Sequence, residues 1–175
     1  MMYLFLFICF IIYLVVPNES LSLLGTTYDS LWHCFSYPFA HASFIHWLVN
    51  AIALGTMWEP ICNIYIRKFY ATSQSSPALI KVKLFFEVYM GAVIASLFTV
   101  KDIPTIGASG MVFFLLGMLI ILNPTKRQLI SFIPVAIAIV MQIFFSNSNI
   151  FLHILAFIFG VLFIIIKSIW VQKNI

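Results

Sequence analysis

The stretch around Ser109 combines a candidate nucleophile with space for a reacting group. Ser109 lies between the small residues Gly107, Ala108 and Gly110, and a wholly apolar run follows. Small neighbours leave the serine hydroxyl uncrowded, and a helix that begins here directs its free backbone N–H groups towards the serine. Because such N–H groups can stabilise an oxyanion, the stretch is suited to acyl transfer.

Two other apolar stretches carry the polar side chains that would complete such a site. His46 and Asn50 are four residues apart, about 40° around a helix, so they share a face. His153 lies about 5 Å into the last apolar stretch, close to the depth expected for Ser109. A neutral His153 can take the serine proton and return it to a leaving amine. His46, Asn50 and the serine N–H can bind the oxyanion.

The remaining polar residues predict neither a triad nor a metal centre. No aspartate lies in the half of any apolar stretch that would share the level of Ser109 and His153, so we expect a Ser–His dyad and not a triad. His41 and His46 are five residues apart, about 140° on one continuous helix, which argues against a two-histidine metal or haem site. We expect no metal and no cofactor, and we assign His41 to ordering the preceding loop. The three cysteines are scattered and predict no disulfide framework.

Composition places the chain in a membrane. Of its 175 residues, 63% are hydrophobic and 8% are charged, and the mean hydropathy is +1.12. Such values exclude a soluble domain and predict an all-α polytopic membrane protein with a single domain over 1–175. The net charge of +4 therefore does not indicate a nucleic-acid partner, and the partner we expect is the lipid bilayer.

Six apolar stretches predict six spans, approximately 2–16, 42–66, 84–100, 109–122, 129–145 and 150–167. The first lacks a basic n-region and a small-residue cleavage site, so we expect a retained span and not a signal peptide. The fourth rises only about 21 Å against a hydrocarbon layer of about 30 Å. Ser109 is therefore expected below the membrane surface, in a water-filled cavity.

The basic residues predict the orientation of these spans. Two loops and the C-terminal tail carry all but one of the nine basic residues, and all three lie on one side if six spans alternate. The positive-inside rule makes that side the cytoplasm and places both termini there, with Ser109 near the outer surface. The residues on that side are Arg67, Lys68, Lys81, Lys83, Lys126, Arg127, Lys167 and Lys173, and Lys101 lies opposite.

Three motifs in order resemble those of the rhomboid intramembrane serine proteases, in their six-span bacterial form. They are H-x4-H-x3-N at His41, His46 and Asn50; G-x-S-G at Gly107, Ser109 and Gly110; and a last-span histidine at His153, followed by Ala156 and Gly160 where the family has G-x3-G. The resemblance implies Ser109 as nucleophile, His153 as base, and His46 and Asn50 as oxyanion helpers. Phe113 stands where relatives often have a tyrosine that stacks on the base.

The resemblance also implies a substrate and a place in the cell. The substrate would be a single-pass membrane protein cut near the outer side of a bacterial plasma membrane. Two other classes stay open: a non-catalytic membrane-binding member of the superfamily, and a small transporter or proton relay. We also expect the fifth span, with Pro134 as a hinge, to admit substrate, so that Phe144→Ala or Phe145→Ala would speed cleavage.

Overall fold

The computed structural model describes residues 1–17, 20, 22–27, 29–99, 104–122, 125 and 149–173. Over these ranges the chain forms five α-helices and three short 3-10 helices. The same ranges contain no β-strand, and their β-type pairing is limited to an isolated bridge between Thr26 and Thr105. The prediction of an all-helical fold is confirmed for this part of the chain. The six-span count stays a prediction, because the predicted fifth span over 129–145 lies outside the described residues.

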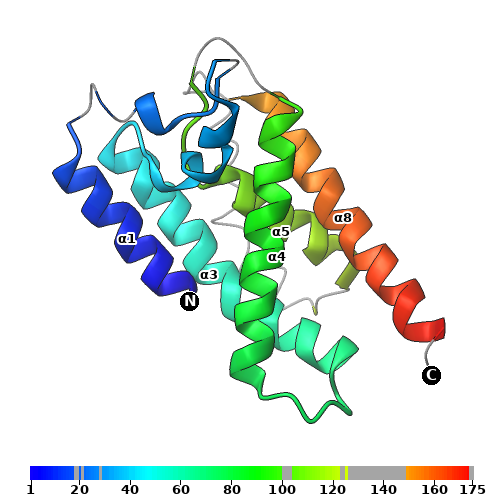
Figure 1. The fold of residues 1–175 in the computed structure, drawn as a ribbon. Helices are drawn as coiled ribbons and strands as arrows, with labels where there is room; N and C mark the ends of the chain where they lie inside the picture. Colours follow the sequence, from blue (N-terminus) through cyan, green and yellow to red (C-terminus); the bar gives the residue numbers. More distant parts are fainter. Residues whose placement is uncertain are drawn as a thin grey trace.

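The first helix, α1 (Met2–Val15), leads into a loop with three 3-10 helices. These are η1 (Ser22–Leu24), η2 (Leu31–Phe35) and η3 (Tyr37–Phe39). Figure 1 shows this loop at one end of the bundle, with the N-terminal end of α1 and the C-terminal end of α8 on the other side. We call the end with the 3-10 helices the loop end.

Helices α3 (Phe44–Phe69) and α4 (Pro77–Leu97) begin at serine caps. The Ser43 and Ser76 hydroxyls accept backbone N–H groups of their own first turns at 3.1 and 3.3 Å, the usual role of serine at this position. Helix α4 therefore begins at Pro77, not near residue 84 as the hydropathy suggested. Proline suits the first helical position. Because α4 begins there, Lys81 and Lys83 are helical as well.

Helix α5 (Ser109–Leu122) lies inside the bundle and packs against α3, α4 and α8 (Figure 1). Its closest neighbour is α8 (Ile150–Lys173), and glycines permit this approach. A Cβ added at Gly117 would lie 2.0 Å from the Phe157 carbonyl oxygen, and one at Gly160 would lie 2.0 Å from that of Phe114. The two helices thus touch backbone to backbone.

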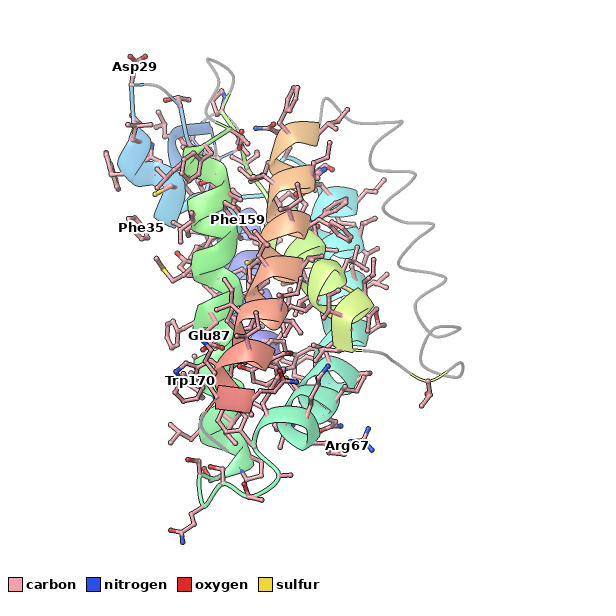
Figure 2. The ribbon with its side chains drawn as sticks, turned by 90° about the vertical axis from the view of Figure 1, so that its right-hand side faces the viewer. Asp29, Phe35, Arg67, Glu87, Phe159 and Trp170 are labelled. Carbon is pink, nitrogen blue, oxygen red and sulfur yellow. The ribbon has the colours of Figure 1, made fainter. Side chains whose placement is uncertain are left out.

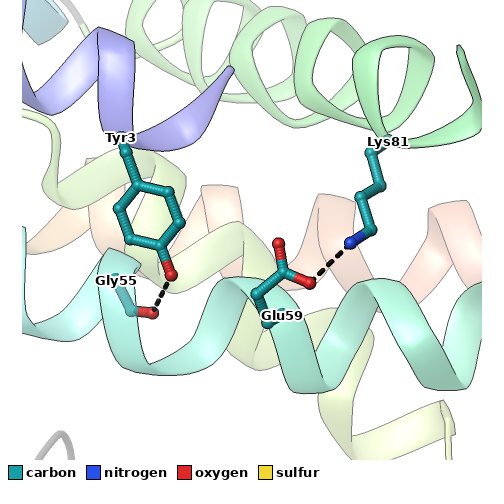
Figure 3. Close-up of polar contacts among 4 residues, drawn as sticks. All are labelled: Tyr3, Gly55, Glu59 and Lys81. Atoms are coloured by element: carbon teal, nitrogen blue, oxygen red, sulfur yellow. Dashed lines mark hydrogen bonds and ion pairs between the residues drawn. The ribbon is translucent and has the colours of Figure 1, made fainter. Parts of the chain in front are cut away.

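The opposite end of the bundle is basic. Figure 2 shows Asp29 at the loop end and Arg67 at the far end of α3, which we call the basic end. Lys81 of α4 pairs with Glu59 of α3 at 2.5 Å, and Tyr3 of α1 reaches the Gly55 carbonyl oxygen (Figure 3). Within the described ranges, α8 is the helix long and apolar enough to cross a membrane by length and composition, whereas α1 and α5 are shorter apolar helices.

Candidate active site

Ser109 is the first residue of α5, and the segment before it is held by the first loop. The Ala108 carbonyl oxygen accepts the N–H groups of Met111 and Val112 at 3.0 and 3.3 Å and so starts the helix. The Gly107 N–H donates to the Tyr37 carbonyl oxygen at 2.9 Å. Ser109 supplies the next helical amide, which has no acceptor within the helix because it lies in the first turn. Its side chain is buried, with 4% exposed.

His153 lies in the first turn of α8 and meets Ser109 across the α5–α8 contact. Its Nε2 is 2.9 Å from Ser109 Oγ, a hydrogen-bond distance, and the histidine is only 3% exposed. Phe113, one turn after Ser109, stacks on the imidazole with ring centroids 4.3 Å apart and planes inclined by 7°. No hydrogen-bond partner of the other ring nitrogen, Nδ1, lies among the described residues.

His46 and Asn50 face the same point from α3. Gly107 has a φ of +111°, which favours glycine, and a Cβ there would lie 2.6 Å from His46 Nε2 and 3.6 Å from Asn50 Nδ2. The glycine therefore leaves room for both side chains beside Ser109. Asn50 is 1% exposed, and its Nδ2 has no acceptor within the described part of the chain. A buried amide without an acceptor is costly, so it is a donor suited to a ligand.

His41 contacts the loop before Ser109 and also the ring of His46. Its Nε2 accepts the Ala108 N–H at 3.4 Å, so its Nδ1 donates to the Phe39 carbonyl oxygen, also at 3.4 Å. Burial, followed by the effect of His46, lowers the pKa of His41 and favours this neutral form. The two rings lie 5.1 Å apart. The expected separation by 140° is wrong, because α3 begins at Phe44 and His41 precedes it.

Tyr37 holds the other side of the serine turn. Its hydroxyl donates to the Ala92 carbonyl oxygen of α4 at 3.0 Å, and a Cβ added at Gly110 would lie 2.5 Å from that hydroxyl. Gly110 thus admits the tyrosine next to Ser109. Burial raises the pKa of Tyr37, so the hydroxyl remains a donor. The sequence did not predict this contact of Tyr37 with α4 and Gly110, because Tyr37 is one of several aromatic residues in the loop.

Asn149 is a second residue that the sequence analysis did not single out. Its side chain caps α8 through the Leu152 N–H and also contacts Thr99 and Thr105. A signal was present, because asparagine immediately before an apolar helical run is a typical N-cap.

The described residues contain no group of three or more His, Cys, Asp or Glu side chains that could hold a metal ion. The proposed gate residues Pro134, Phe144 and Phe145 lie outside these residues, as do Lys101, Lys126 and Arg127. The polar groups gathered around Ser109 are therefore those of the histidines and of Asn50.

Ser109 and His153 thus form a buried serine–histidine pair between two apolar helices. The family model described as Rhomboid domain matches residues 28–170, and the chain belongs to the rhomboid family. The resemblance found in the sequence is thereby confirmed. Rhomboids are a family of intramembrane proteases, and this chain is accordingly an integral membrane protein. No match is found among curated proteins or among solved structures.

Proposed function

We propose that this protein is a serine endopeptidase that cuts transmembrane segments of membrane proteins near the outer side of the bilayer. Ser109 is the nucleophile and His153 is the general base. The observation that carries the proposal is the 2.9 Å distance between His153 Nε2 and Ser109 Oγ, both of them buried. A serine hydroxyl is a poor nucleophile alone and gains reactivity from an adjacent base at this distance.

The proposed reaction passes through an acyl-enzyme. Ser109 Oγ attacks the scissile carbonyl carbon while its proton moves to His153 Nε2, and the carbonyl oxygen becomes an oxyanion. The C–N bond then breaks, and the leaving amine takes the proton from His153. Water attacks the acyl-enzyme in the same manner, with His153 again acting as base, and frees Ser109. Stacking of Phe113 on the imidazole supports the orientation that both steps need.

Three donors near Ser109 would stabilise the oxyanion. The Ser109 N–H lies at the start of α5, where the helix dipole also favours negative charge. The Asn50 amide supports the proposal because its Nδ2 is buried without an acceptor in the described part of the chain. The His46 ring lies on the same side of Gly107. Pre-positioned donors of this kind stabilise the charge that develops in the transition state.

The depth of Ser109 is consistent with cleavage near one surface. Helix α5 rises about 21 Å, and its last turn is contacted by Lys68, whose Nζ donates to the Ile121 carbonyl oxygen at 3.3 Å. If this lysine marks the inner interface, Ser109 lies roughly 9 Å below the outer one in a hydrocarbon layer of about 30 Å. The expected substrates are single-pass membrane proteins, which reach such a depth from the lipid.

The basic end supports a cytoplasmic location for both termini. Arg67, Lys68 and Lys81 lie at this end of the bundle together with the free ends of α1 and α8. The positive-inside rule then places the loop end outside, in what we expect to be a bacterial plasma membrane.

Labelling by a fluorophosphonate probe in detergent tests the proposal. Wild-type protein should be labelled and should cleave a reporter with a helical transmembrane segment, and Ser109→Ala should do neither while it retains the same helical circular dichroism. Ser96→Ala is the matched control, since Ser96 is a buried serine whose hydroxyl bonds within α4. A wild-type protein without labelling and cleavage, or a Ser109→Ala variant that still cleaves, overturns the assignment.

A further inference from the structure

Asn149 joins three segments that meet at the loop end. It immediately precedes α8 and is 9% exposed. Its Oδ1 accepts the Leu152 N–H at 3.3 Å, and its Nδ2 donates to the Thr99 carbonyl oxygen at 2.9 Å and to Thr105 Oγ1 at 3.1 Å. These partners also fix the orientation of the amide, because a backbone N–H can only donate and a carbonyl oxygen can only accept.

The first of these contacts sets the start of α8. Asparagine is among the best N-cap residues, and the bond to the third helical N–H is the usual capping bond. The His153 N–H donates to the Asn149 carbonyl oxygen at 3.3 Å, which places the histidine in the turn that Asn149 opens. A shift of Asn149 along or around the axis of α8 therefore moves His153 with it.

The other contacts tie that turn to the segment that carries Ser109. Thr105 lies four residues before Ser109, and its backbone pairs with Thr26 in both directions at 3.2 Å. Thr99 follows the end of α4. The Asn149 amide thus connects the segment that leads to Ser109 with the first turn of α8, which carries His153. This connection lies at the opposite end of the α5–α8 contact from Gly117 and Gly160.

We propose that Asn149 is a positioning residue that sets the Ser109–His153 distance through its amide contacts with Thr105 and Thr99. This inference rests on the proposed function. The amide acts through the Leu152 N–H of α8 on one side and through the Thr99 carbonyl oxygen and the Thr105 hydroxyl on the other, without touching the reacting atoms. Loss of its donors leaves α8 capped but removes the bond that holds the first turn of α8 against residues 104–107. Misplacement by about 1 Å can cost about 100-fold in rate.

Four variants separate positioning from stability. Asn149→Ser keeps an N-cap side chain but is too short to reach Thr99 and Thr105. Thr105→Val removes the hydroxyl at nearly constant volume, and Thr105→Ser retains it. Ser76→Ala removes a comparable cap from α4 at the basic end, far from Ser109.

The measurements are the rate constant of fluorophosphonate labelling, kcat and KM for a transmembrane reporter, and the melting temperature, all in detergent. We expect Asn149→Ser and Thr105→Val to lower the labelling rate and kcat by about 10- to 100-fold with KM unchanged, while Thr105→Ser stays within about twofold of wild type. Ser76→Ala should lower the melting temperature without slowing labelling.

Wild-type labelling rates in both Asn149→Ser and Thr105→Val overturn the inference. So does a rate loss in Thr105→Ser equal to that in Thr105→Val, because the hydroxyl would then not matter. If Asn149→Ser does not fold, the comparison between the two Thr105 variants decides alone. The proposed function fails separately, through absence of wild-type labelling or through activity in Ser109→Ala.

Discussion

The two ends of the bundle hold their helices together with different polar chemistry. At the loop end the contacts join neutral groups that are almost fully buried, such as His153 with Ser109 and Tyr37 with the Ala92 carbonyl oxygen. Each of these bonds connects separate elements. In a low-dielectric environment such bonds are strong, and leaving one partner unpaired is costly.

At the basic end the contacts involve charged groups that are only partly buried. The side chains of Lys81 and Glu59 are 29% and 42% exposed, and the half-buried Lys167 donates to the Tyr70 hydroxyl at 2.8 Å. Exposed pairs contribute little to stability. The comparison indicates that buried bonds fix the relative positions of the helices at the loop end, around Ser109 and His153, whereas the charged contacts at the basic end constrain them less.

The strongest test of this contrast is removal of the base. His153→Ala should lower reporter cleavage by about 10²–10⁴-fold, because Ser109 would lose its proton acceptor. Cleavage kinetics and probe labelling measure the effect, with circular dichroism as the check on folding. Activity close to wild type in a folded His153→Ala protein would place the base elsewhere.

Asn50→Ala should have the next largest effect. Loss of one oxyanion donor typically costs about 10²–10³-fold in kcat, and some activity should persist because the Ser109 N–H and His46 remain. KM should change little, since the donor acts on the transition state. Asn63→Ala is the matched control, an exposed asparagine on the same helix towards the basic end. An unchanged kcat in Asn50→Ala removes this residue from the site.

His41→Phe should act mainly on stability. The substitution leaves the buried Ala108 N–H without its acceptor, at a cost of about 1–3 kcal/mol, and loosens the turn before Ser109. We expect a lower melting temperature in detergent and a smaller loss of labelling than in Asn50→Ala. His33→Phe, in the same loop but with a ring that contacts Trp32, is the control. Equal melting temperatures for both variants would contradict the role of His41.

The smallest effect is expected at the basic end. Glu59→Gln removes the charge opposite Lys81 and should change stability by about 0–1 kcal/mol, as for exposed ion pairs elsewhere. Labelling of Ser109 should remain at the wild-type rate. Thermal unfolding at low and high salt measures the first quantity. A large loss of stability, or any slowing of labelling, would show that the two ends are not as different as their exposure suggests.

Periodicity and composition in the sequence predicted apolar helices where α1, α3, α5 and α8 lie, and they brought Ser109 close to His153. They placed the start of α4 too late, and the span predicted over 129–145 stays a prediction. Ser109 and His153 both lie near those ends of their apolar stretches that alternating spans place on one side, so counting residues at 1.5 Å each brings them to one level. His46 and Asn50 share a helix face because four residues correspond to little more than one helical turn. These inferences hold because helix geometry relates sequence distance directly to spatial position.

The loop contacts could not be derived in this way. The angle predicted between His41 and His46 assumed one continuous helix, but the Ser43 cap starts α3 after His41. The bonds from His41 to Ala108 and from Tyr37 to Ala92 connect non-helical or distant segments. Hydrophobic periodicity does not predict such contacts, since they depend on how the first loop folds over the bundle. The position of Asn149 before an apolar run predicts its role as an N-cap, but nothing in the sequence predicts its hydrogen bond to Thr105.

The close approach of the α5 and α8 backbones at Gly117 and Gly160 also bears on the Ser109–His153 distance. Each glycine lies about 10–12 Å along its helix from Ser109 or His153, and the helices touch there without side chains between them. A methyl group at this point would wedge the helices apart, and a tilt of only about 5° would displace the far ends by about 1 Å. Two glycines remote from Ser109 and His153 thereby help to set the distance between those two side chains.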